Sequence, residues 1–267
     1  MLTTRFVNGA PNWLDVATPD LDGALSFYGG LFGWQFVSAG PDAGGYGFFQ
    51  RDGATVAGGM PSGPEQGPPA WTVYFRSDDA QATAEAAEQA HGRVLVRPVD
   101  VMGQGHLAVL ADQAGAVFGI WQPGRTRGVD VANEPGALCW AELYTPDIAA
   151  AAAFYHRVLG LETSGVPFPG GTYTCLNPEG AGEDAMFGGV VPLADDPVEA
   201  QAAPYWLPYF EVEDTDAVVE RAQRLGGTVR VPAASVPGVG RMARLADPYG
   251  ARFAVIRSEP SQGRQAD

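Results

Sequence analysis

The chain has 267 residues, a formal net charge of −15 and 46% hydrophobic residues. A protein of this charge has no means of replacing the counterions on a phosphate backbone, and it is repelled by anionic membranes. We therefore expect neither nucleic acid nor a membrane as a partner. All 16 basic residues are arginines, which excludes a Schiff-base amine, a pyridoxal anchor and a phosphate-loop lysine.

Several features favour a cytoplasmic protein. The two cysteines, Cys139 and Cys175, are too few for a disulfide framework and suit a reducing compartment. No apolar run reaches the roughly 18 residues that a membrane span requires. The segment from Met1 to Pro11 lacks the basic start and the apolar core of a signal peptide.

The sequence repeats itself once. Three groups in the first half recur 127 positions later: Trp13, Thr18-Pro19-Asp20 and Phe27-Tyr28 match Trp140, Thr145-Pro146-Asp147 and Phe154-Tyr155. A second echo, 110–118 against 245–253, is shifted by 135 positions, so the second copy holds about eight extra residues. A repeat of this length indicates two domains. We predict a first domain over 1–122, a linker over 123–136, a second domain over 137–257 and a polar, disordered tail over 258–267.

Each half contains the pattern of strand, helix and three strands twice. Alternation from Trp13 to Thr18 is typical of a strand, and Asp20 can cap a helix with one apolar stripe. The other strands predicted in the first half are 34–38, 47–51, 55–60, 71–76, 94–100, 106–110 and 116–121. A second helix is predicted over 78–90. The β-α-β-β-β unit is therefore expected four times, over 12–60, 70–122, 137–192 and 205–257.

Four such units resemble the vicinal oxygen chelate superfamily, which includes glyoxalase I, extradiol dioxygenases, fosfomycin-resistance enzymes and bleomycin-resistance proteins. The resemblance rests on Asp20, Phe27-Tyr28, Leu31-Phe32-Gly33, Asp147, Phe154-Tyr155, Leu159-Gly160, Asp112, Gly115 and Asp247-Pro248-Tyr249-Gly250. It covers nearly the whole chain and looks most like the two-domain branch labelled hydroxylase or glyoxalase-like in high-GC bacteria. It implies an α+β fold of tandem glyoxalase/bleomycin-resistance domains, in which four modules form two cup-shaped sheets.

Metal-using members of that family place His, Gln or Glu on the cup side of four strands. In this sequence, those positions fall on Trp13, Trp140, Thr72, Leu207, Gly58 or Gly59, Gly119, Gly188 or Gly189, and Ala254. These are not side chains that bind a divalent cation. The sequence therefore predicts no metal and no other cofactor.

The cups are instead expected to carry acids and aromatic rings. The candidate catalytic residues are Asp15, Glu142, Tyr74, Tyr209 and His106, the last as a proton shuttle. The candidate ligand-binding residues are Trp13, Trp140, Thr72, Arg76, Trp121, Tyr144, Leu207, Glu211 and Arg241.

Two interpretations of the acids stay open, because a carboxylate inside a sheet must be paired or hydrogen-bonded. One is a general base or ligand anchor whose pKa is raised by partial burial. The other is an internal ion pair of Asp15 with Arg76, and of Glu142 with Arg241 or Arg244. The tyrosines and tryptophans are likewise either site residues or ordinary core residues.

Three functions follow from these patterns. The first is a metal-free protein that binds a small apolar or aromatic metabolite, for sequestration or secondary metabolism, as bleomycin-resistance relatives do. The alternative is a hydroxylase-, lyase- or isomerase-like enzyme that uses Asp15 or Glu142 with tyrosine as acid and base. The third is a metal-dependent lyase or dioxygenase. Because the two halves already form an internal pseudo-dimer, we expect a monomer or a homodimer, with a small molecule as its partner.

Overall fold

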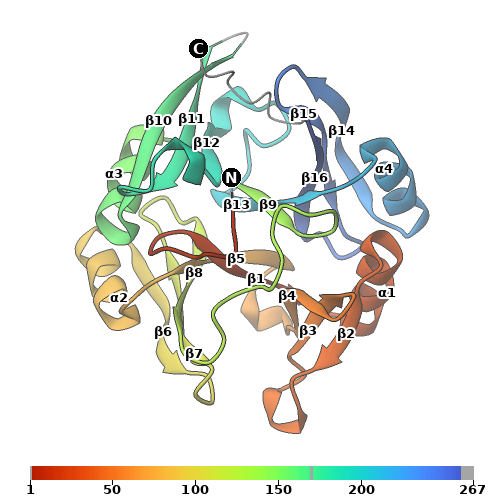
Figure 1. Ribbon diagram of the computed structural model, residues 1–267, viewed down its shortest axis with the longest axis horizontal. Helices are drawn as coiled ribbons and strands as arrows, with labels where there is room; N and C mark the ends of the chain where they lie inside the picture. The colour runs from red at the N-terminus through yellow and green to blue at the C-terminus, as the bar shows by residue number, and fades with distance from the viewer. Residues whose placement is uncertain (1, 169–170, 260–267) are drawn as a thin grey trace.

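A computed structural model describes residues 2–168 and 171–259 (Figure 1). It contains two eight-stranded mixed sheets, of order β2-β3-β4-β1-β5-β8-β7-β6 and β10-β11-β12-β9-β13-β16-β15-β14. Each sheet joins two units through one antiparallel pair, β1 with β5 in the first sheet and β9 with β13 in the second. The predicted α+β fold of tandem domains is confirmed.

The first half consists of β1 (Pro11–Thr18), α1 (Leu21–Phe32), β2 (Gln35–Ser38), β3 (Gly47–Arg51), β4 (Ala54–Pro61), β5 (Ala70–Arg76), α2 (Ala80–Gln89), β6 (Arg93–Asp100), β7 (Gly105–Ala111) and β8 (Val117–Pro123). The second half consists of β9 (Leu138–Thr145), α3 (Ile148–Leu159), β10 (Leu161–Phe168), β11 (Gly171–Pro178), β12 (Gly188–Pro192), β13 (Tyr205–Glu211), α4 (Thr215–Arg224), β14 (Thr228–Val236), β15 (Gly240–Ala246) and β16 (Arg252–Ser258).

The predicted elements lie close to these bounds. The predicted strands of the first half differ from the observed ones by at most two residues at either end. The predicted tail starts too early, because Ser258 belongs to β16 and the Glu259 amide still bonds to the Val239 carbonyl. The rest of the tail, from residue 260, lies outside the described residues.

Each α-helix begins at an aspartate that caps it. The side chains of Asp20, Asp79, Asp147 and Asp214 each accept a hydrogen bond from the backbone N–H three residues further on. Such caps satisfy one of the unpaired amides at a helix start and fix where the helix begins. In the described part of the chain, no helix has the length and apolar character to cross a membrane.

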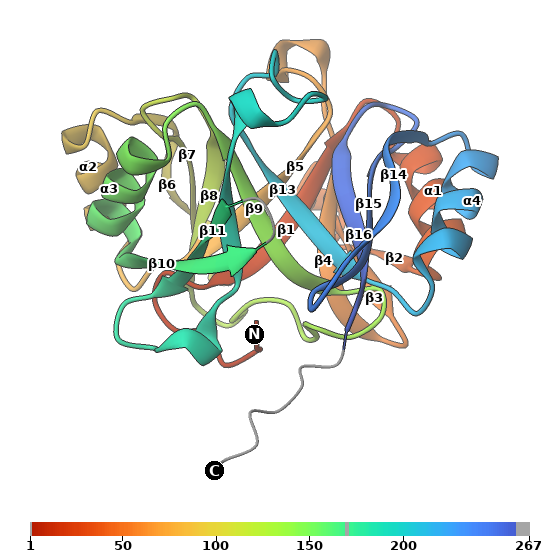
Figure 2. The same ribbon diagram turned by 90° about the horizontal axis from the view of Figure 1, so that it is seen from above.

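The two sheets pack back to back, and their concave faces open in opposite directions (Figure 1). Large aromatic rings fill the space between them: Phe75 lies 4.9 Å from Trp206, and Trp71 lies 5.3 Å from Phe210 between ring centroids. Helix α1 packs beside α4, and α2 beside α3, at the two ends of this interface (Figure 2). We call the concave face of the β1–β8 sheet the first cup, and that of the β9–β16 sheet the second cup.

A buried hydrogen-bond network crosses the interface between the halves. The Tyr28 hydroxyl donates to Asp247 Oδ2 over 3.1 Å and accepts from Trp71 Nε1 over 2.9 Å. The other carboxylate oxygen, Asp247 Oδ1, stabilises the turn after β15 by accepting hydrogen bonds from the backbone N–H groups of Tyr249 and Ala251. The tyrosine of the Phe-Tyr repeat thus ties α1 to the terminal hairpin of the other half.

An equivalent network runs from the second half to the first. The Tyr155 hydroxyl donates to Asp112 Oδ2 over 3.1 Å and accepts from Trp206 Nε1 over 2.9 Å. The two echoes found in the sequence are therefore the two ends of one repeated contact between the domains.

Removing either tyrosine hydroxyl is expected to destabilise the fold. Tyr28→Phe or Tyr155→Phe leaves a buried carboxylate oxygen and an indole N–H unpaired, which costs about 1–3 kcal/mol of unfolding free energy. Tyr249→Phe is the control, since its hydroxyl bonds to Asp20 at an exposed site and should change stability by less than about 0.5 kcal/mol. Urea denaturation measures all three. Equal effects of Tyr28→Phe and Tyr249→Phe would contradict the role given to this network.

Candidate functional site

The acid of the first cup is deeply buried. Asp15 on β1 is 5% exposed, and it accepts hydrogen bonds from the hydroxyls of Tyr46 (3.3 Å) and Tyr74 (3.4 Å). Burial raises the pKa of Asp15 to about 7, although the bonds from Tyr74 and Tyr46 act in the opposite direction. Tyr46 is itself fixed by the Trp13 indole, which donates to its hydroxyl over 2.9 Å.

Chain segments cross the mouth of the first cup. The Arg76 guanidinium bonds to the Phe6 carbonyl over 2.7 Å, and the Trp121 indole bonds to the Thr126 carbonyl over 2.8 Å. A cavity of about 590 Å³ remains at the mouth, lined by Thr4, Phe6, Trp13, Phe48, Gln50, Thr55, Arg125, Thr126, Arg127, Gly128, Val129 and Asp130. Asp15 does not line it, so the carboxylate lies beneath the walls of the cavity.

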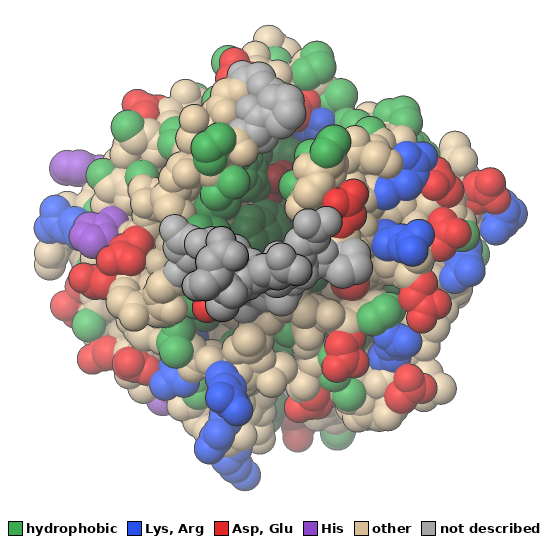
Figure 3. Space-filling view, turned by 45° about the horizontal axis from the view of Figure 1, so that its top comes forward, with side chains coloured by type: hydrophobic (Ala, Val, Ile, Leu, Met, Phe, Trp, Pro, Cys, Tyr) green, Lys and Arg blue, Asp and Glu red, His purple; other side chains and the backbone are tan. Residues whose placement is uncertain are grey.

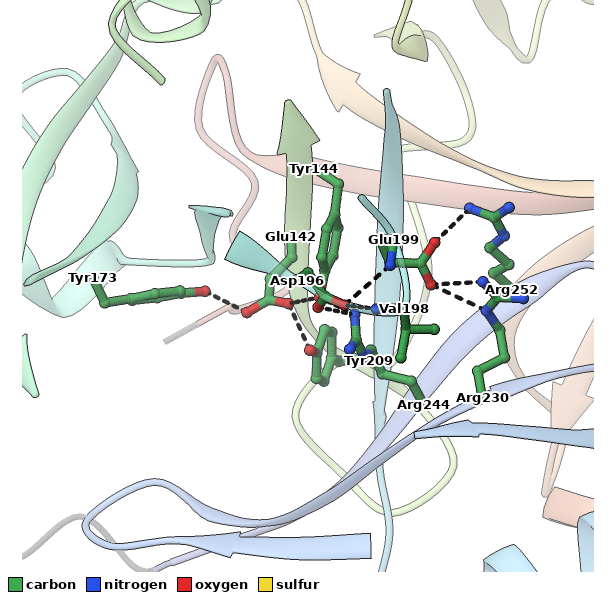
Figure 4. A network of polar contacts seen from close by, with 10 residues as sticks. All are labelled: Glu142, Tyr144, Tyr173, Asp196, Val198, Glu199, Tyr209, Arg230, Arg244 and Arg252. Carbon is green, nitrogen blue, oxygen red and sulfur yellow. Dashed lines mark hydrogen bonds and ion pairs between the residues drawn. The ribbon is translucent and has the colours of Figure 1, made fainter. Parts of the chain in front are cut away.

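The acid of the second cup is more accessible and has more hydrogen-bond donors. Glu142 on β9 is half-buried. Its Oε1 accepts from the Tyr173 hydroxyl over 2.6 Å, while its Oε2 accepts from Tyr209 (2.6 Å) and Tyr144 (3.1 Å) (Figure 4). The Trp140 indole donates to the Tyr173 hydroxyl over 3.1 Å, as Trp13 does to Tyr46 in the first cup. One carboxylate with a tyrosine cage therefore lies in each cup.

Glycines make room for these tyrosines. A Cβ on Gly58 would lie 2.1 Å from the Tyr46 hydroxyl, and one on Gly189 would lie 2.1 Å from the Tyr173 hydroxyl. A Cβ on Gly119 would lie 2.0 Å from the Tyr74 ring. Any side chain at these three positions would displace a tyrosine from its carboxylate.

The second cup is an open hollow with aromatic and aliphatic walls. The rings of Tyr144 and Tyr205 stack at 5.0 Å and 8°. Apolar residues that pack around these rings are Leu193, Leu207, Tyr209, Ala254, Ile256, Trp140, Val191, Ala202 and Met242. Figure 3, which looks toward this side of the molecule, shows a hollow lined largely by hydrophobic side chains, with acidic ones inside it.

Arginine–carboxylate pairs anchor one border of the second cup. In the segment 193–204, Asp196 pairs with Arg244 at 2.6 Å, and Glu199 pairs with Arg230 (2.9 Å) and Arg252 (3.0 Å). Arg244 also donates to the Tyr144 hydroxyl over 2.9 Å, which links the segment to Glu142 (Figure 4).

The register shows where the second half gains its extra residues. Asp15 pairs with Gly58 and Glu142 with Gly189, so the shift has grown from 127 to 189 − 58 = 131 at β12. Between Tyr74 and Tyr209 it is 209 − 74 = 135. Four residues are therefore added before β12 and four between β12 and β13, in the segment 193–204.

The structure brings most of the predicted site residues together. Trp13, Asp15, Thr72 and Tyr74 meet across β1 and β5, and Trp140, Glu142, Tyr144, Leu207 and Tyr209 meet across β9 and β13. Arg76 and Trp121 hold the segments at the mouth of the first cup instead. Glu211 lies at the end of β13, where it accepts hydrogen bonds from Ser258.

Two predicted residues lie on the wrong face of their strands. His106 is exposed and pairs with Gln122, whose side chain accepts from the Ala80 amide at the start of α2, so it faces the helix side. Arg241 pairs at 2.6 Å with Asp216 of α4, also on the helix side. Side chains alternate along a strand, so neither residue reaches a cup.

The ion-pair interpretation of the acids is wrong in both halves. Arg76 bonds to Asp78 (2.9 Å) and to a backbone carbonyl rather than to Asp15. Arg241 is engaged by α4, and Arg244 pairs with Asp196 rather than with Glu142. Tyrosine hydroxyls satisfy both acids instead.

Tyr46 and Tyr173 were not predicted as site residues from the sequence. Tyr46 directly precedes β3, and Tyr173 lies on β11. These two residues are 127 positions apart, as Trp13 and Trp140 are. The repeat itself was therefore the signal that could have identified them.

The donor set of the cups does not fit a divalent metal. Over residues 2–168 and 171–259, no three His, Cys, Asp or Glu side chains come together in a way that could hold one. At the positions that the resemblance matches to the family's metal ligands, the described strands present tryptophan, threonine, leucine, glycine and alanine. Each cup offers one carboxylate, already engaged by tyrosine hydroxyls, where a metal site needs three or more protein ligands.

Comparison with known proteins places the chain in a family. The sequence profile of the Glyoxalase/Bleomycin resistance protein/Dioxygenase superfamily matches residues 10–140 and 137–255. The anthracycline biosynthesis protein DnrV of Streptomyces peucetius is 41% identical over 268 residues, which cover 95% of this chain and 94% of that protein.

Two solved structures share the fold at low identity. The Mn(II)-bound glyoxalase from Novosphingobium aromaticivorans matches with a TM-score of 0.62 at 16% identity, over 96% of this chain and 87% of that one. The 2,3-dioxygenase LapB from Pseudomonas sp. KL28 matches with a TM-score of 0.62 at 13% identity, over 98% and 96% of the two chains. With its tandem modules and its two profile matches, the chain belongs to the glyoxalase/bleomycin resistance/dioxygenase superfamily.

Proposed function

We propose that this protein binds a flat, largely apolar small molecule in its second cup, without a metal ion, in the making or handling of a secondary metabolite. The observation that carries the proposal is the half-buried Glu142 among tyrosine hydroxyls, beside the aromatic and aliphatic residues of the second cup. Small-molecule sites have this composition: mostly apolar walls with a few polar groups that fix the orientation of the ligand. The half-buried Trp140 offers a ring face to a flat ligand. The stacked Tyr144–Tyr205 pair adds an aromatic wall, whose ring faces are taken by each other and by Arg244 and Arg252.

The two cups support different roles. Asp15 is closed off beneath its tyrosines, whereas Glu142 keeps exposed surface. We therefore assign binding to the second cup alone. The relative named for anthracycline biosynthesis supports a polycyclic aromatic ligand, since anthracyclines are built on a flat ring system.

Proton transfer is a second candidate function. The Tyr209 and Tyr173 hydroxyls lie 2.6 Å from Glu142, a distance at which a carboxylate and a hydroxyl can pass a proton. An enzyme of this kind would exchange an acidic C–H proton of its ligand with D₂O, and Glu142→Gln would slow the exchange. A protein that only binds would leave the ligand undeuterated.

Calorimetric titration with 2-hydroxyanthraquinone tests the proposal, on protein treated with a chelator. We expect one site per chain and the same Kd before and after chelation. Trp140→Phe removes part of the wall and the bond to Tyr173, and should weaken binding about fivefold to tenfold. Trp13→Phe is the matched control in the first cup and should leave the Kd within about twofold. Binding that needs added metal, or that depends on Trp13 and not on Trp140, would refute the proposal.

A further inference from the structure

The direction of the hydrogen bonds in the second cup determines whether a ligand must donate or accept a hydrogen bond there. Each tyrosine hydroxyl has one proton to donate, and a carboxylate only accepts. The hydroxyls of Tyr144, Tyr173 and Tyr209 all lie within hydrogen-bond distance of Glu142, at 3.1, 2.6 and 2.6 Å. All three protons are therefore directed at Glu142, and none of these three hydroxyls has a proton left for a ligand. The Tyr205 hydroxyl has no hydrogen-bond partner among the described residues, but its oxygen is fully buried.

Two further donors beside the cage, the Trp140 indole and Nη1 of Arg244, are also engaged. The Trp140 indole N–H is directed at the Tyr173 oxygen over 3.1 Å. Arg244 donates to the Tyr144 oxygen over 2.9 Å, and its charge is matched by Asp196 at 2.6 Å. The positive charge nearest to Glu142 is thus already neutralised within the protein.

What remains on this floor is the capacity to accept hydrogen bonds, and Glu142 keeps exposed surface. Among the described residues, the Tyr209 oxygen receives no hydrogen bond, and Glu142 Oε1 receives only the one from Tyr173. A ligand hydroxyl or N–H that points at these oxygens gains a bond. An ether, carbonyl or carboxylate oxygen in the same place meets only lone pairs and negative charge, and it is buried without a partner.

We infer that the second cup is selective for a hydrogen-bond donor: it takes an aromatic ligand through a phenolic or alcoholic hydroxyl, or an N–H group, and discriminates against the corresponding methyl ether and carboxylate. This selectivity rests on the proposed function of the cup. A site built to pair a polar group rejects an analogue that lacks it more strongly than an apolar pocket rejects an extra methyl group.

Four probes with one ring system test the inference: 2-hydroxyanthraquinone, 2-methoxyanthraquinone, anthraquinone-2-carboxylate and unsubstituted anthraquinone. Calorimetric Kd values are measured at pH 6, so that the phenol keeps its proton. We expect the hydroxyl probe to bind at least about tenfold more tightly than the methoxy probe, and the carboxylate to bind most weakly. Anthraquinone should resemble the methoxy probe within about threefold, which separates the loss of a donor from the bulk of a methyl group.

Glu142→Gln provides the matched variant, because its amide can donate as well as accept. The preference for hydroxyl over methoxy should fall to less than about threefold in this variant. Equal Kd values for the hydroxyl and methoxy probes in the native protein would overturn the inference while leaving the proposed function intact. So would a Kd of anthraquinone as tight as that of the hydroxyl probe. If no probe binds, both the proposed function and the inference fall.

Discussion

Asp15→Asn is expected to stabilise the protein at pH 8 and to change its stability little near pH 4. The folded state raises the pKa of Asp15 from 3.8 to about 7 through burial, so it binds this proton more tightly than the unfolded chain does. The stabilising contribution of the protonated form is complete below about pH 4 and is lost as pH rises toward 7. Above that pH the native protein holds a buried charge, which asparagine removes.

The size of this effect follows from the shift. Each pKa unit corresponds to about 1.4 kcal/mol, so a shift of about three units sets an upper limit on the order of 4 kcal/mol between the two ends of the pH range. Urea denaturation of the native protein and of Asp15→Asn at pH 4, 6 and 8 measures the difference. The exposed Asp78→Asn serves as control and should track the native protein at each pH. A difference between native protein and Asp15→Asn that stays constant with pH would show that Asp15 titrates normally.

Glu199→Gln is expected to destabilise the second half by about 2–4 kcal/mol. Glu199 is 1% exposed and faces both Arg230 and Arg252, so the substitution leaves two partly buried guanidinium groups without a counter-charge. The segment 193–204 should also lose protection against amide hydrogen exchange, since Glu199 fastens it to β14 and β16.

The exposed pair of Glu220 and Arg224 supplies the control for Glu199. It lies at 3.5 Å on the surface of α4, and Glu220→Gln should cost less than about 0.5 kcal/mol. Equal losses for Glu199→Gln and Glu220→Gln would mean that the buried pair does not anchor the segment.

The fold was largely predictable because each local signal agreed with the others. The sequence from Trp13 to Thr18 alternates as a strand with two different faces should, Asp20 supplies a cap, and Gly33 ends α1 with a φ of 75°. What the repeat cannot state is which units share a sheet and which face each other. The bonds from Tyr28 to Asp247 and from Tyr155 to Asp112 depend on that arrangement, so their partners could not be identified from spacing alone.

Site residues could be predicted where the alternation of a strand clearly shows which of its side chains share a face. Asp15 and Glu142 each lie two residues after a repeated tryptophan, and residues two apart in a strand share a face. His106 and Arg241, 135 positions apart, occupy equivalent places, and both were assigned to the wrong face. In the sequence, β7 and β15 carry apolar residues on both faces, so alternation does not decide which face is buried. The partner of Arg76 was predicted wrongly for another reason. Arg76 lies at the end of its strand, and its flexible side chain reaches Asp78, two residues away, more readily than the buried Asp15.

The two cups show how a duplicated site can diverge. Both copies keep a tryptophan, an acid and two tyrosines in the same relation. In the first copy, segments from the chain start and the linker cross the mouth and the acid is buried. In the second copy the segment 193–204, which contains the four residues added between β12 and β13, stands at the border, and the acid keeps access to the hollow.

The most direct test is a crystal structure of the chelator-treated protein soaked with 2-hydroxyanthraquinone. We predict the ring system in the second cup beside Trp140, with its hydroxyl within hydrogen-bond distance of Glu142 or Tyr209 and no metal ion between them. Density for the ring system in the first-cup cavity beside Trp13 and Phe48, or a metal ion bridging the ligand to the protein, would contradict it.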